Sequence, residues 1–441
     1  MGRQAYRKEL QRKKVKKPVK YIAAFFALAL FLLLILYLAA KIPREMIRDN
    51  CLASAEYLNA LDLFGYGIEG VEASKNDHYA DSVLLNIGWN YDETYTMRSI
   101  MLSAYYYSPE NYENGNFLAT IRDGLGANQQ YLRYWHGSLS IVRPLLVIMP
   151  VQGIYILDAV VLALLFAALL IRLIRKREYT AALSLSLALA ATAWWTVPFS
   201  LEYTWVCMIV LAACLIAIRL SEEEREERYG LFFLLLGMVT NYLDFLTSET
   251  LTLTMPLLLL LWLERKKKSS FKNVLKAAAL WLAGYAGMWV LKWILTGVVF
   301  GENPMPYVMG HIEQRLGGNI RGNVLSESLP VFMLAALYRN ISSLLPFGFG
   351  AVGTIAAAVL LVAVIVFVIL YHRKDYDRNR ILLMAMLALL PFVRILVLHN
   401  HAYIHSFFVF RALAATVMAG VLILGEITGP DPFRRKHGST S

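Results

Sequence analysis

Long apolar runs without a charged residue recur along this 441-residue chain and constrain its fold more than any other feature. The first run, residues 21–40, is long enough to cross a hydrocarbon layer of ~30 Å at about 1.5 Å per residue. Only 17% of the residues are charged, whereas soluble proteins average about a quarter. The sequence therefore predicts an all-α, polytopic membrane protein.

The first apolar run is open to two interpretations, a retained helix and a cleaved secretory signal. It is longer than the usual signal core of about 7–15 residues, and the segment after it, residues 41–45, lacks a small-x-small cleavage site. We therefore predict a first transmembrane helix at residues 21–41, preceded by a basic cytoplasmic N-terminus at residues 1–20.

Lys and Arg residues cluster beside the apolar runs. Nine lie in residues 1–20, and the later clusters fall at the same end of alternate runs. These later clusters are residues 172–177, 265–272, 373–380 and 434–436. This is the positive-inside pattern of membrane proteins. The net charge of +11 therefore indicates topology and contact with anionic lipids, and nucleic acid is not an expected partner.

Counting from one basic cluster to the next predicts about ten transmembrane helices. The predicted spans are residues 21–41, 152–172, 179–196, 203–220, 229–246, 250–264, 273–298, 351–371, 380–398 and 407–426. Nine of them form a predicted bundle within residues 151–427. An even number of spans returns the tail, residues 428–441, to the cytoplasm, and it leaves residues 42–150 and 299–350 outside as two long segments.

The first outer segment, residues 42–150, carries thirteen acidic residues against seven Lys or Arg. An apolar stripe at spacings of three predicts a helix over residues 49–64, ended by Gly65. The stripe consists of Leu52, Ala55, Leu58, Leu61 and Phe64. A second helix is predicted within residues 138–149. We expect both helices to lie at the membrane interface.

Motifs of soluble enzymes are absent from the sequence. It has no phosphate-binding glycine loop, no dinucleotide fingerprint, no H-E-x-x-H and no G-x-S-x-G. Its three cysteines include no C-x-x-C and predict neither a disulfide framework nor a metal site. The candidates for chemistry are therefore clusters of polar residues at the outer ends of the spans.

Two of these clusters lie in the first outer segment. Asp81 precedes an apolar stretch, and it is either the N-cap of a short helix or a functional acid. Arg133 and His136 lie among aromatic residues in Tyr131-Leu-Arg-Tyr-Trp-His. A guanidinium offers a fork of donors that matches phosphate oxygens. The alternative for this second cluster is an aromatic anchor belt at headgroup depth.

Two further clusters lie near the later spans. Asp244, in the run 241–249, is an acid at a depth where carboxylates face a cavity or a partner, although a simple turn is the alternative. His401 and His405 are four residues apart, so a helix places them on one face. Because the acid of H-E-x-x-H is missing, phosphate contact together with Arg411 is favoured over zinc catalysis.

Two single cations complete the set. Lys292 lies near the outer end of the seventh span, where it either contacts phosphate or extends to the headgroups. Arg394 is deeper, and we expect it to be paired inside the bundle.

The overall layout resembles the GT-C glycosyltransferases, membrane enzymes that take a sugar from a polyprenyl-phosphate carrier. The shared features are one N-terminal span, a long first outer loop with an acid and interfacial helices, and a bundle of many spans. The resemblance implies that Asp81 is the acid at the acceptor and that residues 131–136 correspond to a later motif. The chain departs from the family where Ser82 replaces a common second acid, and a Lys-Pro-Pro type string is missing.

Two other runs, residues 241–247 and 400–411, are similar to multi-pass membrane proteins of Gram-positive bacteria. Together these resemblances imply a glycosyltransferase at the outer face of a bacterial cytoplasmic membrane. Its expected partners are a lipid-linked sugar donor, a cell-envelope glycan acceptor and membrane lipids. A divalent cation as cofactor is left open.

The resemblance assigns expected roles to the candidate residues. Asp81 is the expected catalytic base. The expected ligands of the donor phosphate are Arg133, His136, Lys292, His401, His405 and Arg411. Tyr134, Trp135 and Asp244 are expected at the acceptor or the sugar. The alternatives are a transporter or flippase that uses Asp244, Lys292 and Arg394, and a non-catalytic assembly subunit in which Asp81 only caps a helix.

Overall fold

The computed structural model describes residues 3–223, 226–316, 329–344, 351–372 and 375–428. Within these ranges the chain folds into 19 α-helices and three short 3-10 helices, and its only β-structure is two isolated bridges. The described part of the chain is therefore all-α, as the sequence predicts. Of the predicted tail, only Thr428 belongs to the described residues.

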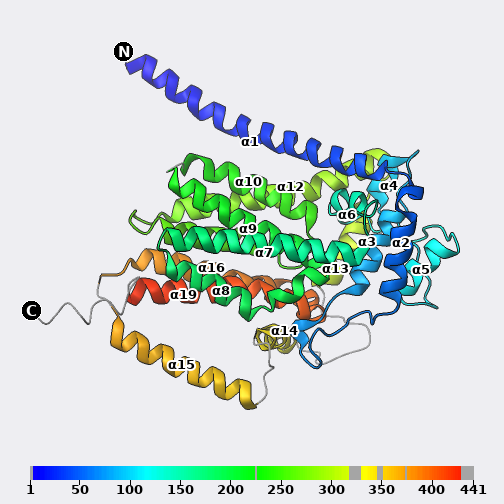
Figure 1. The fold of residues 1–441 in the computed structure, drawn as a ribbon. Helices are drawn as coiled ribbons and strands as arrows, with labels where there is room; N and C mark the ends of the chain where they lie inside the picture. Colours follow the sequence, from blue (N-terminus) through cyan, green and yellow to red (C-terminus); the bar gives the residue numbers. More distant parts are fainter. Residues whose placement is uncertain (1–2, 224–225, 317–328, 345–350, 373–374, 429–441) are drawn as a thin grey trace, which may run out of the picture.

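Most of the long helices run side by side and form a bundle (Figure 1). The bundle helices are α1 (Arg3–Ala40), α7 (Val151–Arg175), α8 (Tyr179–Ala191), α9 (Leu201–Glu222), α10 (Glu226–Leu243), α11 (Leu251–Leu263), α12 (Phe271–Phe300), α16 (Arg378–Val397) and α19 (Ala414–Thr428). Helix α15 (Ala351–Tyr371) lies at the edge and packs against α19. Each of the ten predicted spans overlaps at least one helix, but residues 179–196 run past the end of α8 and residues 407–426 begin before the start of α19.

Six helical stretches are long and apolar enough to cross a membrane. They are Val19–Ala40, Val151–Arg175, Leu201–Glu222, Phe271–Phe300, Arg378–Val397 and Ser406–Thr428. The last stretch joins α18 (Ser406–Val409), the 3-10 helix η3 (Phe410–Leu413) and α19. Helices α8, α11 and the later part of α15 are apolar but shorter. The chain thus has the candidate spans of a multi-pass membrane protein.

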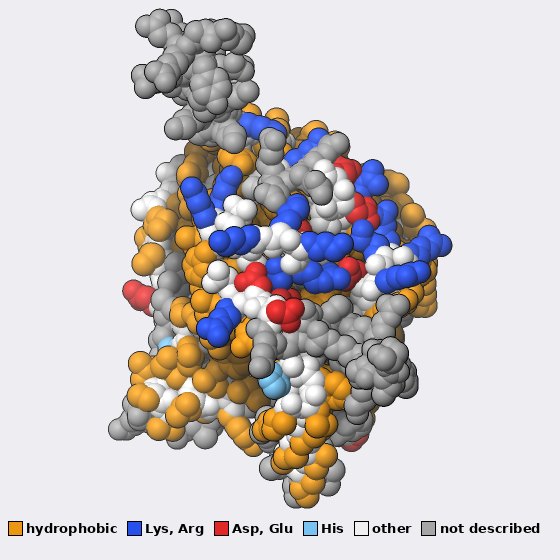
Figure 2. All heavy atoms as spheres, turned by 90° about the vertical axis from the view of Figure 1, so that its left-hand side faces the viewer, with side chains coloured by type: hydrophobic (Ala, Val, Ile, Leu, Met, Phe, Trp, Pro, Cys, Tyr) orange, Lys and Arg blue, Asp and Glu red, His pale blue; other side chains and the backbone are white. Residues whose placement is uncertain are grey.

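The basic clusters gather at one end of the bundle. Both the start of α1 and the end of α19 lie there (Figure 1), and Figure 2 shows many Lys and Arg side chains on this face. Ion pairs connect the clusters to neighbouring helix ends, as in Arg265–Glu178 at 2.8 Å and Arg380–Glu426 at 2.9 Å. The described clusters therefore share one end, as the positive-inside pattern predicts, and residues 434–436 lie outside the described residues.

Short helices cover the opposite end of the bundle (Figure 1). They are α2 (Arg44–Asn59), η1 (Glu72–Ser74), α3 (His78–Trp89), α4 (Thr96–Leu102), α5 (Glu113–Arg122), α6 (Leu139–Leu145), α13 (Met305–Leu316), α14 (Leu329–Ser343) and α17 (His399–Ile404). The 3-10 helix η2 (Trp194–Phe199) links α8 to α9.

The predicted helix over residues 49–64 forms as α2 but ends at Asn59, so Leu61 and Phe64 lie beyond it. The earlier part of its stripe is buried inside the protein, with Ala55 and Leu58 fully inaccessible. Helix α2 packs against α3, α5 and α7. Tertiary contacts therefore set the end of α2, because the apolar pattern itself continues to Phe64.

Two glycines allow α10 and α12 to approach closely. A Cβ atom added at Gly237 would lie 2.1 Å from the Trp281 carbonyl oxygen. A Cβ atom added at Gly284 would lie 2.1 Å from the Leu234 carbonyl oxygen. Small residues at a helix interface permit this kind of backbone contact. The two helices therefore cannot accept a side chain at either position without moving apart.

We expect Gly284→Val to lower the thermal midpoint of the purified protein, because forced separation of α10 and α12 costs about 1–3 kcal/mol. The matched control is Gly420→Val in α19, where an added Cβ atom meets nothing within 4 Å. Both variants place the same residue in a helix, so they differ mainly in packing. Thermal unfolding in detergent measures the effect, and equal midpoints for the two variants would contradict this packing argument.

Candidate functional site

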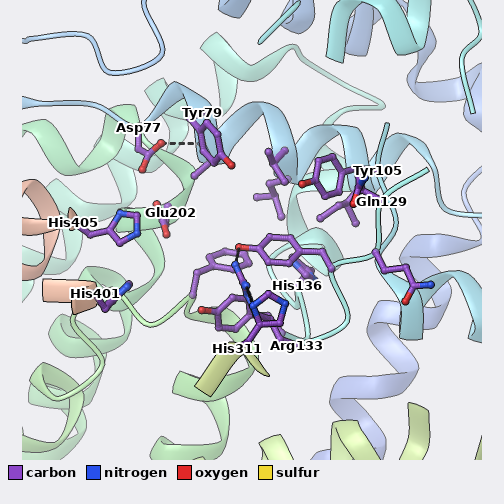
Figure 3. Close-up of a pocket in the computed structure, with 18 of the residues that line it drawn as sticks. Asp77, Tyr79, Tyr105, Gln129, Arg133, His136, Glu202, His311, His401 and His405 are labelled. Atoms are coloured by element: carbon purple, nitrogen blue, oxygen red, sulfur yellow. Dashed lines mark hydrogen bonds between the residues drawn. The ribbon is translucent and has the colours of Figure 1, made fainter. Parts of the chain in front are cut away.

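A cavity of about 440 Å³ lies where the short helices meet the bundle (Figure 3). The segments that line it are far apart in the sequence. The lining residues are Phe64, Asp77, Tyr79, Ala80, Val83, Leu84, Ile87, Tyr105, Gln129, Gln130, Tyr131, Arg133, Tyr134, His136, Glu202, Phe245, Tyr307, His311, His401, His405 and Phe408. Acidic side chains lie on one side of the cavity, and Arg133 with His311 lies on the other (Figure 3).

The acidic side consists of Asp77 and Glu202. Asp77 is the N-cap of α3, and its Oδ1 accepts a hydrogen bond from the Ala80 backbone N–H at 2.8 Å. Glu202 lies in the first turn of α9. The Glu202 carboxyl interacts electrostatically with that of Asp77. Asp77 is buried and Glu202 is half-buried, and ionisation of one of these neighbouring carboxyls opposes ionisation of the other.

Burial raises the pKa of the Asp77 carboxyl to about 6, while the hydrogen bonds from Ala80 and Glu202 act in the opposite direction. Asp77 is therefore a proton acceptor at neutral pH that becomes protonated in mildly acidic solution. A base whose pKa lies near the working pH is well suited to accept a proton from a hydroxyl group.

The basic side centres on the half-buried side chain of Arg133. Its Nη2 donates to the Tyr131 hydroxyl at 2.8 Å, and its Nη1 lies 3.0 Å from His311 Nδ1. The rings of Tyr131 and Tyr134 lie 4.3 and 5.3 Å from the guanidinium carbon. Among the described residues no carboxylate pairs with Arg133, and its Nε has no partner. A guanidinium that lines a cavity and has no carboxylate partner can bind an anionic group of a ligand.

His136 lies beside Arg133 in an unusual backbone conformation, with φ at 51° in the left-handed region. Such a conformation is costly for a residue other than glycine and often marks a functional position. Only 1% of the side chain is exposed. Neither ring nitrogen makes a well-formed hydrogen bond within the described chain, although the Tyr134 backbone interacts weakly with the ring.

Burial, with the nearby charges of Lys292 and Arg133, holds the pKa of His136 well below its usual value. The imidazole is therefore neutral. It offers one N–H donor and one acceptor nitrogen to a ligand in the cavity, but it does not add a positive charge. The sequence-based expectation of a phosphate contact is compatible with this state through the N–H donor.

His401 and His405 lie near the acidic side (Figure 3). Their ring centroids are 4.7 Å apart. His401 lies in α17, whereas His405 is the first residue after this helix, so the two are close without sharing one helix face. His401 Nε2 lies 2.9 Å from the Leu246 carbonyl oxygen. Across the described residues, no three His, Cys, Asp or Glu side chains are grouped so as to hold a metal ion.

Asp81 does not line the cavity, although the sequence singles it out as the acid. It is fully buried in the first turn of α3, one turn after Asp77. The interpretation of Asp81 as the helix N-cap is wrong, because the helix begins earlier and Asp77 caps it.

Four other candidates also lie away from the cavity lining and contact the protein itself. Arg411 donates to the Ala73 carbonyl oxygen at 3.3 Å and to Thr196 Oγ1 at 2.8 Å. Lys292 donates to the Ile100 carbonyl oxygen at 2.8 Å.

The remaining two of the four are Trp135 and Asp244. The Trp135 indole donates to the Met288 carbonyl oxygen, and Asp244 accepts from the backbone N–H groups of Leu246 and Thr247. Arg394, expected to be paired inside the bundle, forms an ion pair with Glu249 at 2.6 Å.

The cavity thus contains five of the ten predicted site residues and several that sequence reasoning missed. The predicted residues in its lining are Arg133, Tyr134, His136, His401 and His405. The missed acids are Asp77 and Glu202. A signal for each was present, because Asp77 directly precedes a helical pattern and Glu202 is an acid at the start of a long apolar run.

Comparisons with protein-family models, with curated proteins and with solved structures found no match for this chain. The site geometry is therefore the basis for a functional proposal.

We expect a carboxyl signal that titrates near pH 6 to belong to Asp77. Infrared difference spectra of the full-length protein in nanodiscs should show a protonated C=O band that disappears as the pH rises through about 6. Asp77→Asn should remove this component. Asp92→Asn is the control, because backbone N–H groups of Tyr95 and Thr94 lower the pKa of Asp92. Persistence of the pH 6 component in Asp77→Asn would show that another group titrates.

Proposed function

We propose that this protein is a GT-C-like glycosyltransferase that transfers a sugar from a polyprenyl-phosphate donor to a cell-envelope acceptor. The observation that carries the proposal is the division of one cavity into a carboxyl pair, Asp77 and Glu202, and an unneutralised guanidinium, Arg133. Glycosyl transfer from a lipid phosphate needs a base at the acceptor and a cation at the leaving group, and the two sides of this cavity match these needs.

On the acidic side, the Asp77 carboxylate removes the proton from the acceptor hydroxyl as its oxygen attacks C1 of the sugar. Positioned general-base help of this kind contributes roughly 10²–10⁴-fold to the rate. The interaction with Glu202 lowers the pKa of Asp77 and so stabilises its ionised form. Asp77 therefore takes the role that the family resemblance implies for Asp81, which lies one helical turn after Asp77.

On the basic side, the bond between C1 and the phosphate oxygen breaks, and its electron pair stays on that oxygen. The phosphate gains negative charge, which the fixed Arg133 guanidinium stabilises more strongly than it stabilises the uncleaved donor. The neutral His136 contributes an N–H donor to a phosphate oxygen.

The walls between the two sides suit the remaining parts of the donor. Tyr79, Tyr105, Tyr131 and Tyr307 supply rings with an apolar face and a polar edge, a combination that fits a sugar. Val83, Leu84 and Ile87 of α3 supply an apolar strip that fits the first isoprene units.

For the topology, we infer ten membrane spans with both termini in the cytoplasm of a bacterial cell. The basic end in Figure 2 then faces the cytoplasm, and the cavity lies at the outer face. Residues 42–150 and 299–350 are the outer segments, and each contributes to the cavity through residues such as Asp77 and His311. Membrane embedding suits a reaction whose donor is itself a lipid.

A transporter or flippase receives less support. The three charges on which that alternative depends are Asp244, Lys292 and Arg394. Each makes the internal contacts described above, and none lines the cavity. A purely structural subunit, in turn, does not explain why a guanidinium that has no carboxylate partner among the described residues faces a cavity.

We expect Asp77→Asn to lower the turnover of polyprenyl-phosphate-linked hexoses about 10²–10⁴-fold, because an amide cannot accept the hydroxyl proton. The assay is release of polyprenyl phosphate by the full-length protein in proteoliposomes with a cell-envelope glycan acceptor. Arg122→Gln, which alters an exposed ion pair with Glu56, is the control. Undiminished release by Asp77→Asn would remove Asp77 from the mechanism, and movement of intact donor across the vesicle would favour a flippase.

We expect Arg133→Lys to weaken binding of polyprenyl phosphate roughly 10–100-fold. An ammonium group lacks the fork of donors that matches phosphate, so one charge-assisted hydrogen bond is lost. Such a bond contributes about 1.5–3 kcal/mol. Equilibrium binding of polyprenyl phosphate in detergent measures the change. Arg122→Lys keeps a surface ion pair with Glu56 and is the matched control. Equal affinities for the two variants would show that the phosphate binds elsewhere.

A further inference from the structure

Asp81 is a buried acid that the proposed reaction leaves without a role. Its side chain is fully inaccessible and joins three helices. Asp81 Oδ1 accepts a hydrogen bond from the backbone N–H of Leu201 at 2.8 Å, and the Ser200 hydroxyl lies 3.4 Å away from the same oxygen. The Tyr155 hydroxyl of α7 donates to Asp81 Oδ2. These contacts attach α3 to α7 and to the start of α9.

The contact with Leu201 supplies a side-chain hydrogen-bond acceptor that the start of α9 otherwise lacks. A helix begins with backbone N–H groups that have no partner within the helix, and the N-cap side chain normally satisfies one of them. Ser200 occupies the N-cap position of α9 but makes no such side-chain bond. Asp81, from another helix, takes this place and fixes the first turn of α9.

The residue next to Leu201 is Glu202, the partner of Asp77 in the cavity. Asp77 and Asp81 are one turn apart on α3, so both point toward the same neighbour. Asp77 contacts the Glu202 side chain, and Asp81 holds the backbone directly before it. A single turn of α3 thus determines both the position of Asp77 and the position of Glu202.

We propose that Asp81 is a positioning residue that holds Glu202 against Asp77 through the first turn of α9. This inference rests on the proposed function only because that function makes Asp77 the base and Glu202 its partner. The contacts themselves do not depend on the reaction. Asp81 accepts hydrogen bonds and does not exchange a proton with the substrate.

The environment of Asp81 supports this assignment. Burial, reinforced by the neighbouring charge of Asp77, raises the pKa of the Asp81 carboxyl well above its usual value, although hydrogen bonds from Tyr155 and Leu201 oppose the shift. Both carboxyl oxygens accept hydrogen bonds, which is a role that does not require proton exchange. An amide can replace the carboxyl, because its oxygen accepts from Leu201 while its nitrogen donates to the Tyr155 oxygen.

The test follows the carboxyl titration of Asp77 in Asp81→Asn and Asp81→Leu, with infrared difference spectra of the full-length protein in nanodiscs. The groups that interact electrostatically with Asp77 are Asp81, Glu202, Tyr79 and Tyr203. We expect Asp81→Asn to keep the titration near pH 6. Asp81→Leu should move it upward by roughly one pH unit, because the Asp77 carboxylate loses the interaction with Glu202 that lowers its pKa.

Turnover of polyprenyl-phosphate-linked hexoses gives a second measurement on the same variants. Asp81→Asn should remain within a few-fold of the natural protein, whereas Asp77→Asn should not. Loss of turnover in Asp81→Asn at every pH, with its thermal midpoint retained, would make Asp81 a reacting group and overturn the proposal. An unchanged Asp77 titration in folded Asp81→Leu would overturn it as well.

The two proposals fail separately. If the natural protein releases no polyprenyl phosphate, the glycosyltransferase proposal is wrong, but the spectroscopic shift still tests the role of Asp81. If Asp81→Leu does not fold, the Asp81→Asn titration and turnover still decide between a positioning residue and a base.

Discussion

The contact between the carboxyl groups of Asp77 and Glu202 is the interaction on which the site depends. It joins α3 to α9 of the bundle, and it sets one wall of the cavity. Because ionisation of one carboxyl opposes ionisation of the other, the contact also influences the charge of that wall. The unneutralised Arg133 on the opposite wall then gives the cavity its polarity. Neither half of the chain creates this arrangement alone.

The helices of this protein are largely predictable from its sequence, because lipid-length apolar runs and basic clusters follow simple physical rules. All ten predicted spans overlap helices, six helical stretches are long and apolar enough to cross a membrane, and the described basic clusters lie at one end. The end of α2 is less predictable, since its apolar stripe continues past Asn59 while packing ends the helix there. Local pattern sets where a helix forms, and tertiary contacts decide where it stops.

The candidate site was predictable only where its residues are close in sequence. Arg133, Tyr134 and His136 stand within four positions, so their shared chemistry is visible in the sequence. Asp77 and Glu202 come from distant segments, and no local pattern pairs them. Choosing between Asp77 and Asp81 also requires the start of α3 and its rotation about its axis, which depend on the cap and on packing against α9.

Arg411 has a consequence for how this architecture can be altered. Its guanidinium binds the Ala73 carbonyl oxygen within residues 42–150 and Thr196 Oγ1 before α9, while the residue itself lies close to α19. Three distant stretches are thereby connected at one point. Grafting residues 42–150 onto another scaffold would remove one acceptor from this buried guanidinium, so residues 42–150 and the bundle must be exchanged together.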